Sequence, residues 1–169
     1  MAYTLERLSQ DIRKVLHDDD GPDGKKMICD LVARALVDRE FVETHLTEEQ
    51  CRPRKVLYED PDLSFCICGH VYPGAAKGAP HDHGSSWAIY GLAEGDTEMT
   101  DWEIVEQGDG DRPHLVSPVR SYAMKPGDCH YYAPGDVHSP DRSGKTVTRL
   151  IRVEGKNLDH VQRSNIKAA

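Results

Sequence analysis

Apolar residues in the first fifty positions recur every three or four residues, which is the spacing of one face of a helix. This pattern predicts a helix capped by Thr4 and a second helix after the polar break at residues 18–22. A third, short helix is expected around residues 41–46, and residues 47–50 fit a capping box that opens one more turn. The helical region ends at Arg52, because the residue before a proline disfavours the helical conformation.

From Lys55 onward apolar and polar residues alternate with a period of two, which is typical of β-strands. The segments Lys125 to Asp128 and Ala133 to Asp136 each place Pro before Gly, which predicts type II turns with a positive φ at the glycine. Many short strands between such turns predict a β-sandwich or a β-barrel. Strand-like runs occupy residues 63–70, 87–92, 97–105, 121–124, 129–132 and 146–153.

Composition and charge narrow the class of protein. The 169 residues suffice for one domain with a substantial core. A formal net charge of −8 argues against nucleic acid or an anionic membrane as a partner, and no apolar run has the length of a membrane span. The N-terminus lacks the pattern of a signal peptide, and five cysteines, an odd number, do not make a disulfide framework. We therefore expect a cytoplasmic protein, in which Cys66 and Cys68 serve as small core side chains.

The candidate chemistry lies in three histidines. His81 and His83 stand two residues apart, so on an extended segment both imidazoles project to the same side. A third imidazole, from His138 on another strand, completes one triangular face of a metal ion and leaves the opposite positions open for substrate or oxygen. A purely structural zinc site would close all four positions with protein ligands. The pattern therefore predicts a reactive metal site.

Two motifs resemble those of the cupins. The first comprises Gly78, His81, His83, Gly91 and Gly95, and the second comprises Gly127, Asp128, Pro134, Gly135 and His138. The resemblance implies a mainly β fold: a single double-stranded β-barrel of the jelly-roll type, with the metal inside the barrel mouth and, in this chain, an N-terminal helical extension. Trp87 and Ala88 occupy the place of the glutamate that the usual motif adds, which leaves a three-histidine site. Such a site is similar to that of the thiol dioxygenases, the cysteine dioxygenase-like branch, and implies Fe(II), with Ni, Zn or Mn as alternatives.

The chain departs from cysteine dioxygenases in the residues that bind the substrate. Glu59 stands where the family has an arginine for the substrate carboxylate, and the last strand lacks the family's histidine and tyrosine. Arg152 occupies the place of that tyrosine, and we expect it to hold an anionic substrate if its side chain faces inward. Tyr132 and His130, on the strand before His138, are the other candidate catalytic residues.

These observations predict one domain in three parts: a helical extension at residues 1–52, the barrel at 53–155 and a C-terminal tail at 156–169. We expect the helices to pack on the barrel, with a homodimer seam as the alternative. The acid Glu98 is placed either in the metal pocket or in solvent. The expected partners are a small-molecule substrate and O₂.

Three function classes are compatible with these residues. The first is a non-haem Fe(II) dioxygenase acting on a small thiol or another small chelating organic substrate. The second is a non-redox metal enzyme, such as an isomerase, decarboxylase or hydrolase, in which the metal acts as a Lewis acid. The third is a non-catalytic cupin that binds a small molecule or a metal. The resemblance favours the first class.

Overall fold

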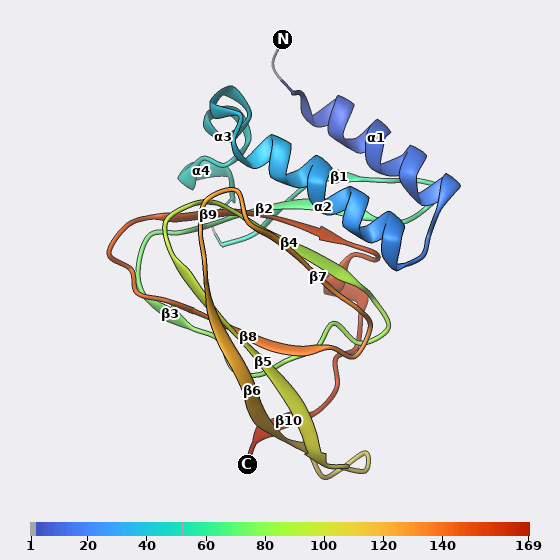
Figure 1. The fold of residues 1–169 in the computed structure, drawn as a ribbon, viewed down its shortest axis with the longest axis vertical. Coiled ribbons are helices and arrows are strands. Elements are labelled where there is room, and N and C mark those ends of the chain that lie inside the picture. The colour runs from blue at the N-terminus through green and yellow to red at the C-terminus, as the bar shows by residue number, and fades with distance from the viewer. Residues whose placement is uncertain (1–2, 52) are drawn as a thin grey trace.

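The computed structural model describes residues 3–51 and 53–169 and begins with a layer of helices (Figure 1). The helices are α1 (Leu5–Asp18), α2 (Pro22–Leu36), α3 (Arg39–His45) and α4 (Glu48–Cys51). Thr4 caps α1 as predicted, because its Oγ1 accepts a hydrogen bond of 3.1 Å from the backbone N–H of Arg7. In the described part of the chain, no helix is long and apolar enough to cross a membrane.

The predicted turn at residues 47–50 forms, but these residues, all of which the structure describes, lack the side-chain hydrogen bonds of a capping box. The carbonyl oxygen of Thr47 accepts hydrogen bonds from the N–H groups of Gln50 and Cys51, at 3.2 and 3.0 Å. Its hydroxyl, however, is buried and has no hydrogen-bond partner among the described residues. Backbone bonds and the hydrogen bond of 3.0 Å from Cys51 Sγ to the carbonyl of His45 therefore hold this turn. Arg52, where the sequence predicts the end of the helical region, lies outside the described residues.

The strands follow the helices and, within the described residues, form two five-stranded sheets. The sheet orders are β1–β2–β9–β4–β7 and β10–β6–β5–β8–β3. The strand bounds are β1 Lys55–Glu59, β2 Cys66–Tyr72, β3 Ala76–Lys77, β4 Ala88–Glu94, β5 Thr97–Glu106, β6 His114–Met124, β7 Cys129–Tyr132, β8 Val137–Arg142, β9 Thr148–Glu154 and β10 Ile166–Ala168.

The strand order is that of a jelly roll. From β2 to β9 the chain passes repeatedly between the sheets, so that β2, β9, β4 and β7 lie in one sheet and β3, β8, β5 and β6 in the other. Neighbours within both sets are antiparallel. The two sheets curve around a shared interior (Figure 1). The mainly β, double-stranded barrel predicted from the sequence is thus confirmed.

The helices cover the outer face of the β1–β2–β9–β4–β7 sheet (Figure 1). Alternation along β4 explains the packing: Ile89 faces the helices, whereas Tyr90 and Leu92 face the barrel interior. The helical stripes are buried against the sheet, as at Ile28 and Val32, although Met27 from the predicted stripe is 54 % exposed. The helices therefore pack on the barrel.

Two tight turns position β7 and β8, which lead to the last of the three histidines. Gly127 and Gly135 adopt φ values of +96° and +84°, as the Pro-Gly pattern predicts. The N–H of Asp128 donates to the carbonyl of Lys125 at 2.9 Å, and the N–H of Asp136 donates to that of Ala133 at 3.1 Å. The second turn ends immediately before β8.

The C-terminal segment is part of the fold. After β9 a short 3₁₀ helix spans Leu158–His160, and β10 then pairs in parallel with β6. The segment that the sequence analysis treats as a tail therefore adds an edge strand to the second sheet. On its way to that edge it crosses the loop that carries His81 and His83, where Ser164 hydrogen-bonds to Asp82.

Candidate metal centre

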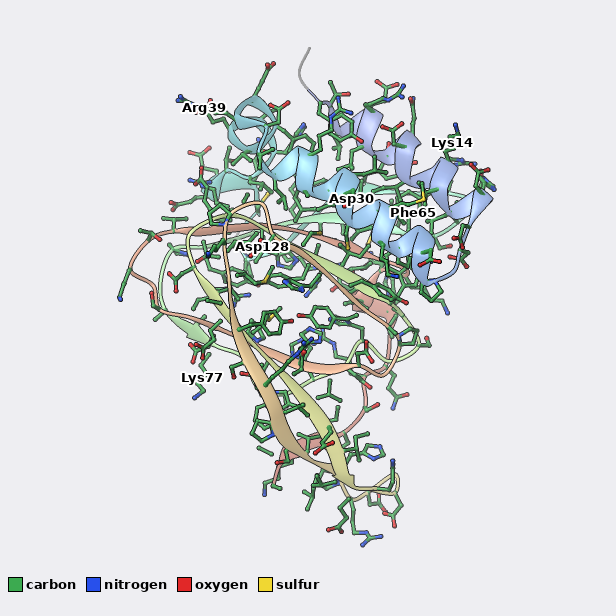
Figure 2. The ribbon with its side chains drawn as sticks, in the orientation of Figure 1. Lys14, Asp30, Arg39, Phe65, Lys77 and Asp128 are labelled. Atoms are coloured by element: carbon green, nitrogen blue, oxygen red, sulfur yellow. The ribbon has the colours of Figure 1, made fainter. Side chains whose placement is uncertain are left out.

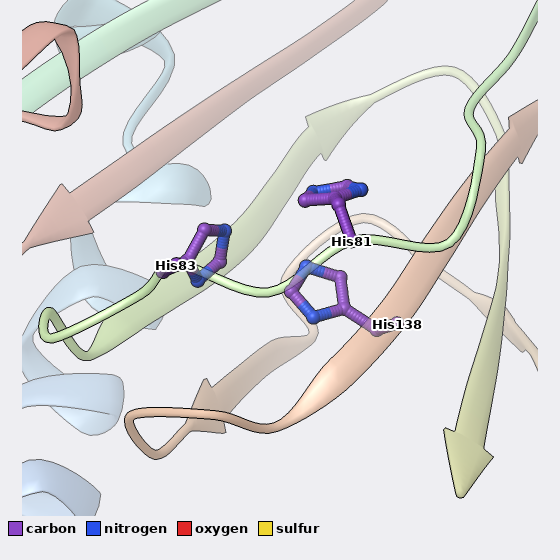
Figure 3. A group of neighbouring side chains, drawn as sticks. All are labelled: His81, His83 and His138. Carbon is purple, nitrogen blue, oxygen red and sulfur yellow. The ribbon is translucent and has the colours of Figure 1, made fainter. Parts of the chain in front are cut away.

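Backbone pairing brings the three predicted histidines together. His138 lies on β8, and His81 lies in the loop that precedes β4. The two residues form an antiparallel bridge in which the N–H of each donates to the carbonyl of the other at 3.0 Å. His83 follows on the same loop, and Figure 3 shows the three rings gathered around one space.

The geometry of the three rings suits a single metal ion. One nitrogen of each ring lies within 4.8 Å of the other two. The ring centroid of His138 is 4.7 Å from that of His81 and 4.8 Å from that of His83. His81 Nδ1 donates to the carbonyl of Ala79 at 2.9 Å, which leaves its Nε2 as the unprotonated nitrogen. Such a bond fixes the tautomer and orientation of a metal-binding imidazole.

Two of the rings contain buried nitrogens without partners. Neither ring nitrogen of His83 has a hydrogen-bond partner among the described residues, and the same holds for Nδ1 of His138. These residues are only 1 % and 2 % exposed. A buried polar group without a partner costs free energy, and metal coordination would supply the missing interaction. The donor set therefore fits a divalent ion of the kind that imidazole prefers.

The electrostatic surroundings keep these imidazoles neutral, as metal ligands must be. Burial lowers the pKa of His83 to about 2, with the positive charge of Arg152 adding to the effect. Burial also lowers the pKa of His138 well below 6.5, and the neighbouring His81 and His83 lower it further. The pKa of His81 is lowered by burial as well, although its bond to Ala79 works in the opposite direction.

A pocket of about 320 Å³ opens beside the histidines and is rich in arginine. His81 and His138 line it together with Tyr72, Tyr90 and His70. Its charged lining consists of Arg54, Arg142, Arg152 and Arg163. A small anion that enters this pocket would therefore meet both the guanidinium groups and the candidate metal site.

Arg152, the predicted substrate-binding residue, lines this pocket. Arg152 lies on β9, where it is paired with Cys68 on the neighbouring strand β2 and with Tyr90 on the neighbouring strand β4. Its guanidinium is already engaged, because it forms an ion pair of 2.6 Å with the buried carboxylate of Glu154. Its role toward a substrate stays a prediction.

Tyr132 and His130 occupy different positions relative to the histidines. The Tyr132 ring stacks on His138, with centroids 3.9 Å apart, and its hydroxyl lies 2.8 Å from that of Tyr122. His130 packs near Tyr122 and lines a separate cavity of about 460 Å³. Tyr132 thus fixes the ring of a candidate ligand, whereas His130 lies away from the arginine-rich pocket. Glu98 is exposed and faces solvent.

The pocket residues that the sequence analysis did not single out include Arg142, Tyr90 and His70. The signal for Arg142 was present, since it lies four residues after His138 on the same strand and therefore shares its face. For Tyr90, no local feature of the sequence indicates which face of its strand enters the barrel. His70 is 2 % exposed, and its Nδ1 lies 3.2 Å from the hydroxyl of Tyr72.

A second group of potential metal ligands comprises Cys66, Cys68 and Glu154, all buried. The two Sγ atoms are 3.7 Å apart, and Cys66 Sγ is 3.4 Å from the carboxylate of Glu154. That carboxylate is neutralised by Arg54 and Arg152. The hydrogen bond to Cys68 and burial raise the pKa of the Cys66 thiol far above its usual value. The Cys66 thiol is therefore protonated, and both cysteine side chains are buried in the core.

Comparison with known proteins adds information on the fold. No family model and no curated protein matches the sequence. Similar solved structures include the cupin domain of Cnp3 from Schizosaccharomyces pombe, with 15 % identity over 62 % of this chain and 60 % of that chain and a TM-score of 0.47. An uncharacterised protein with a double-stranded β-helix domain from Klebsiella pneumoniae has 18 % identity, coverage of 67 % and 77 %, and a TM-score of 0.46.

The DMSP lyase DddQ from Ruegeria pomeroyi is also similar, with 13 % identity over 65 % of this chain and a TM-score of 0.46. The match spans 49 % of that chain, and the match to Cnp3 likewise spans less than two thirds of its chain. At this level of identity the likeness concerns the fold alone. Any activity of this protein has to be argued from its own residues.

Proposed function

We propose that this protein is a metal-dependent enzyme of the cupin type, and specifically a non-haem Fe(II) dioxygenase that acts with O₂ on a small organic substrate. The cluster of His81, His83 and His138 carries this proposal, because three neutral imidazoles next to an accessible pocket leave coordination positions open. When bound there, ferrous iron would supply the activation of oxygen. A small thiol or another small chelating compound is the proposed substrate.

The protein's own residues have defined tasks in this proposal. The three histidines hold the metal, and the bond from His81 to Ala79 together with the stacking of Tyr132 on His138 keeps two of the rings in place. The arginines of the pocket attract an anionic substrate toward the metal. The burial of His83 and His138 limits the access of bulk water to the reacting groups.

A non-redox metal enzyme is the second candidate. One observation favours it: the substrate-binding residues of cysteine dioxygenase are not matched, since Glu59 stands in place of the family's arginine and Arg152 in place of its tyrosine. In such an enzyme the same three histidines would hold a Lewis acid, and the pocket would still bind an anion.

The deciding experiment is elemental analysis of protein purified without added metal, followed by oxygen-electrode assays with small thiols and diketones. A dioxygenase should contain iron and consume oxygen only in the Fe(II)-loaded form. Substrate turnover with Zn(II) or Mn(II) and no oxygen consumption would support the non-redox enzyme instead. A protein without metal that does not take up any of these ions would contradict both proposals.

The matched control separates the candidate ligands from other histidines. His138→Ala should lose both metal and oxygen uptake, whereas His114→Ala should keep both. His114 lies on β6, and its Nδ1 accepts a hydrogen bond from the N–H of Gly108, away from the three histidines. Equal metal content in both variants would contradict the assignment.

A further inference from the structure

The arginines in the pocket differ in how their charges are balanced. Arg54 and Arg152 share the buried carboxylate of Glu154, at 2.9 and 2.6 Å, and Arg54 also contacts Asp159 at 2.6 Å. Neither Arg142 nor Arg163 forms an ion pair with any residue in the ranges 3–51 and 53–169. Arg163 is exposed, where water can solvate its charge. Arg142 is buried.

The surroundings of Arg142 are aromatic. The residue is only 5 % exposed and lies at the end of β8. One Nη donates to the hydroxyl of Tyr90 at 2.7 Å, and the guanidinium carbon lies 3.9 Å from the ring centroid of Tyr72. Its Nε has no hydrogen-bond partner among the described residues. A hydroxyl and an aromatic face compensate a buried cation only in part.

This arrangement lowers the stability of the folded protein when no ligand is bound. A buried charge without a counter-charge lowers the stability of the folded protein, and the carboxylate of a ligand would supply the missing counter-charge. Arg163, which also has no ion-pair partner among the described residues, lines the same pocket and makes it more attractive to an anion. The aromatic contacts hold the guanidinium in one orientation, which lowers the entropy lost on binding.

We propose that Arg142 is the specificity-determining residue of the pocket and binds the carboxylate of a small organic acid, holding the rest of that molecule against the metal site. This inference rests on the proposed function, because it names the class of substrate that the enzyme would bind next to the metal site. Arg142 lies four residues after His138 on β8, so the two side chains are on the same face. The carboxylate-binding residue and a candidate metal ligand therefore belong to one strand. A rigid strand sets the distance between them.

The carboxylate class follows from the shape and the chemistry of the pocket. A guanidinium presents planar N–H donors that match a carboxylate better than a neutral amide or alcohol. The volume of about 320 Å³ is at the small end of ligand pockets, which favours a compact acid over a nucleotide or a peptide. Arg152 was the sequence-based candidate for this role, but its guanidinium is neutralised by Glu154.

The test is direct binding of propionate, with propionamide as the neutral probe of the same shape. The full chain, labelled with ¹⁵N, is titrated by NMR before and after removal of metal with a chelator, and the arginine Nε–H signals report the contact. Propionate should shift signals in both forms, whereas propionamide should not. Arg142→Gln should weaken propionate binding by about tenfold or more, because the charged partner is lost.

Two further variants separate this role from a structural one. Arg39→Gln removes an exposed arginine on α3 and should bind propionate as the native protein does. Arg142→Lys keeps the charge but not the planar fork, and its affinity should fall between those of the native protein and Arg142→Gln. The midpoint of thermal unfolding of Arg142→Gln should be unchanged or higher, since a buried cation has been removed.

The proposal is overturned if Arg142→Gln binds propionate as tightly as the native protein, or if propionamide binds equally well. Because the titration is repeated on metal-free protein, its outcome does not depend on the proposed oxygen chemistry. A protein that binds propionate through Arg142 but takes up no iron would overturn the proposed function and leave this inference standing.

Discussion

Ser164 donates two hydrogen bonds to the carboxylate of Asp82, which lies between the candidate metal ligands His81 and His83. Its hydroxyl donates to one carboxylate oxygen at 2.6 Å, and its backbone N–H donates to the other at 3.0 Å. The same carboxylate also accepts the N–H of Gly84 at 3.1 Å. The C-terminal segment thus holds the loop that carries His81 and His83, and the position of both imidazoles depends on a contact that joins residues far apart in the chain.

Removing the Ser164 hydroxyl should loosen the metal site more than the fold. In Ser164→Ala we expect metal affinity to fall by about tenfold, the lower end of what residues that support metal ligands contribute. The backbone bond to Asp82 remains, so the loss in unfolding free energy should be about 1–2 kcal/mol. Competition with a coloured chelator measures the first quantity and urea denaturation the second.

The control for this variant is Ser121→Ala. Its hydroxyl forms a comparable bond of 2.7 Å to Thr100, but on an exposed part of the second sheet. That variant should keep the native metal affinity. If both serine variants bind metal equally well, the C-terminal segment has no part in forming the site.

Gly84 offers a second test of the same contact. Its φ is +57°, and a Cβ there would lie 2.3 Å from the backbone oxygen of Gln162. Gly84→Ala should therefore strain the backbone by about 1–2 kcal/mol and also push the C-terminal segment away from the loop. We expect a lower midpoint of thermal unfolding and a metal affinity reduced at least as much as in Ser164→Ala.

Gly110→Ala is the matched control, since a Cβ at Gly110 meets no heavy atom within 4 Å among the described residues and its φ is not positive. The control should leave both quantities unchanged. A Gly84→Ala protein with native stability and native metal content would show that the segment adapts freely and does not hold the loop.

Local sequence signals predicted much of the architecture. The change from helical spacing to a period of two at Lys55 separates the helical layer from the barrel, and the Pro-Gly pairs predict the turns at Gly127 and Gly135. The three histidines were also predicted to meet, because their spacing and the resemblance to cupin motifs both point to one site. The turns are signalled by adjacent residues, whereas the meeting of His138 with His81 and His83 follows from the resemblance of two separate segments to cupin motifs.

The parts that the sequence did not predict depend on pairing between distant segments. Nothing near Ser164 indicates that it lies against Asp82, and the burial of His70 depends on how β2 pairs with β9. The ion pair that occupies Arg152 requires Glu154, two residues later on the same face of β9. Arg142 was within reach, because the alternation from His138 places it on the inner face, but its missing counter-charge is visible only in three dimensions.

The first two histidines of the site should contribute to metal binding as strongly as the third. His81→Ala and His83→Ala each remove one of three ligands and should lower metal affinity by several orders of magnitude, measured as metal content after dialysis. Since His83 is 1 % exposed and has no protein partner for its ring nitrogens among the described residues, His83→Ala should cost the metal-free protein little beyond the cavity it leaves. Metal bound in full to His83→Ala would remove it from the ligand set.

Asp60 joins the helical layer to the barrel, at the start of the turn between β1 and β2. Its buried carboxylate accepts hydrogen bonds from Arg13 of α1 at 2.9 Å, from the hydroxyl of Tyr58 at 3.0 Å, and from the N–H groups of Asp62 and Leu63 at 3.0 and 2.8 Å. Burial alone would raise the pKa of Asp60, but these hydrogen bonds and the charge of Arg13 outweigh it and lower the pKa.

Because the pKa of Asp60 is lower in the folded protein, its contribution to stability is present in full above the unfolded value of about 4 and is lost as pH falls through the folded value. Asp60→Asn should lower the unfolding free energy at pH 7 by about 2–3 kcal/mol, the usual effect of losing hydrogen bonds to a buried charge. Urea denaturation between pH 7 and pH 3 should show the native protein and the variant converging below about pH 4. Asp23→Asn, which removes a carboxylate whose side chain is 83 % exposed beside Lys26, should change stability little at any pH. A difference between Asp60→Asn and the native protein that persists unchanged at pH 3 would mean that packing, and not the ionised carboxylate, holds α1 to the barrel.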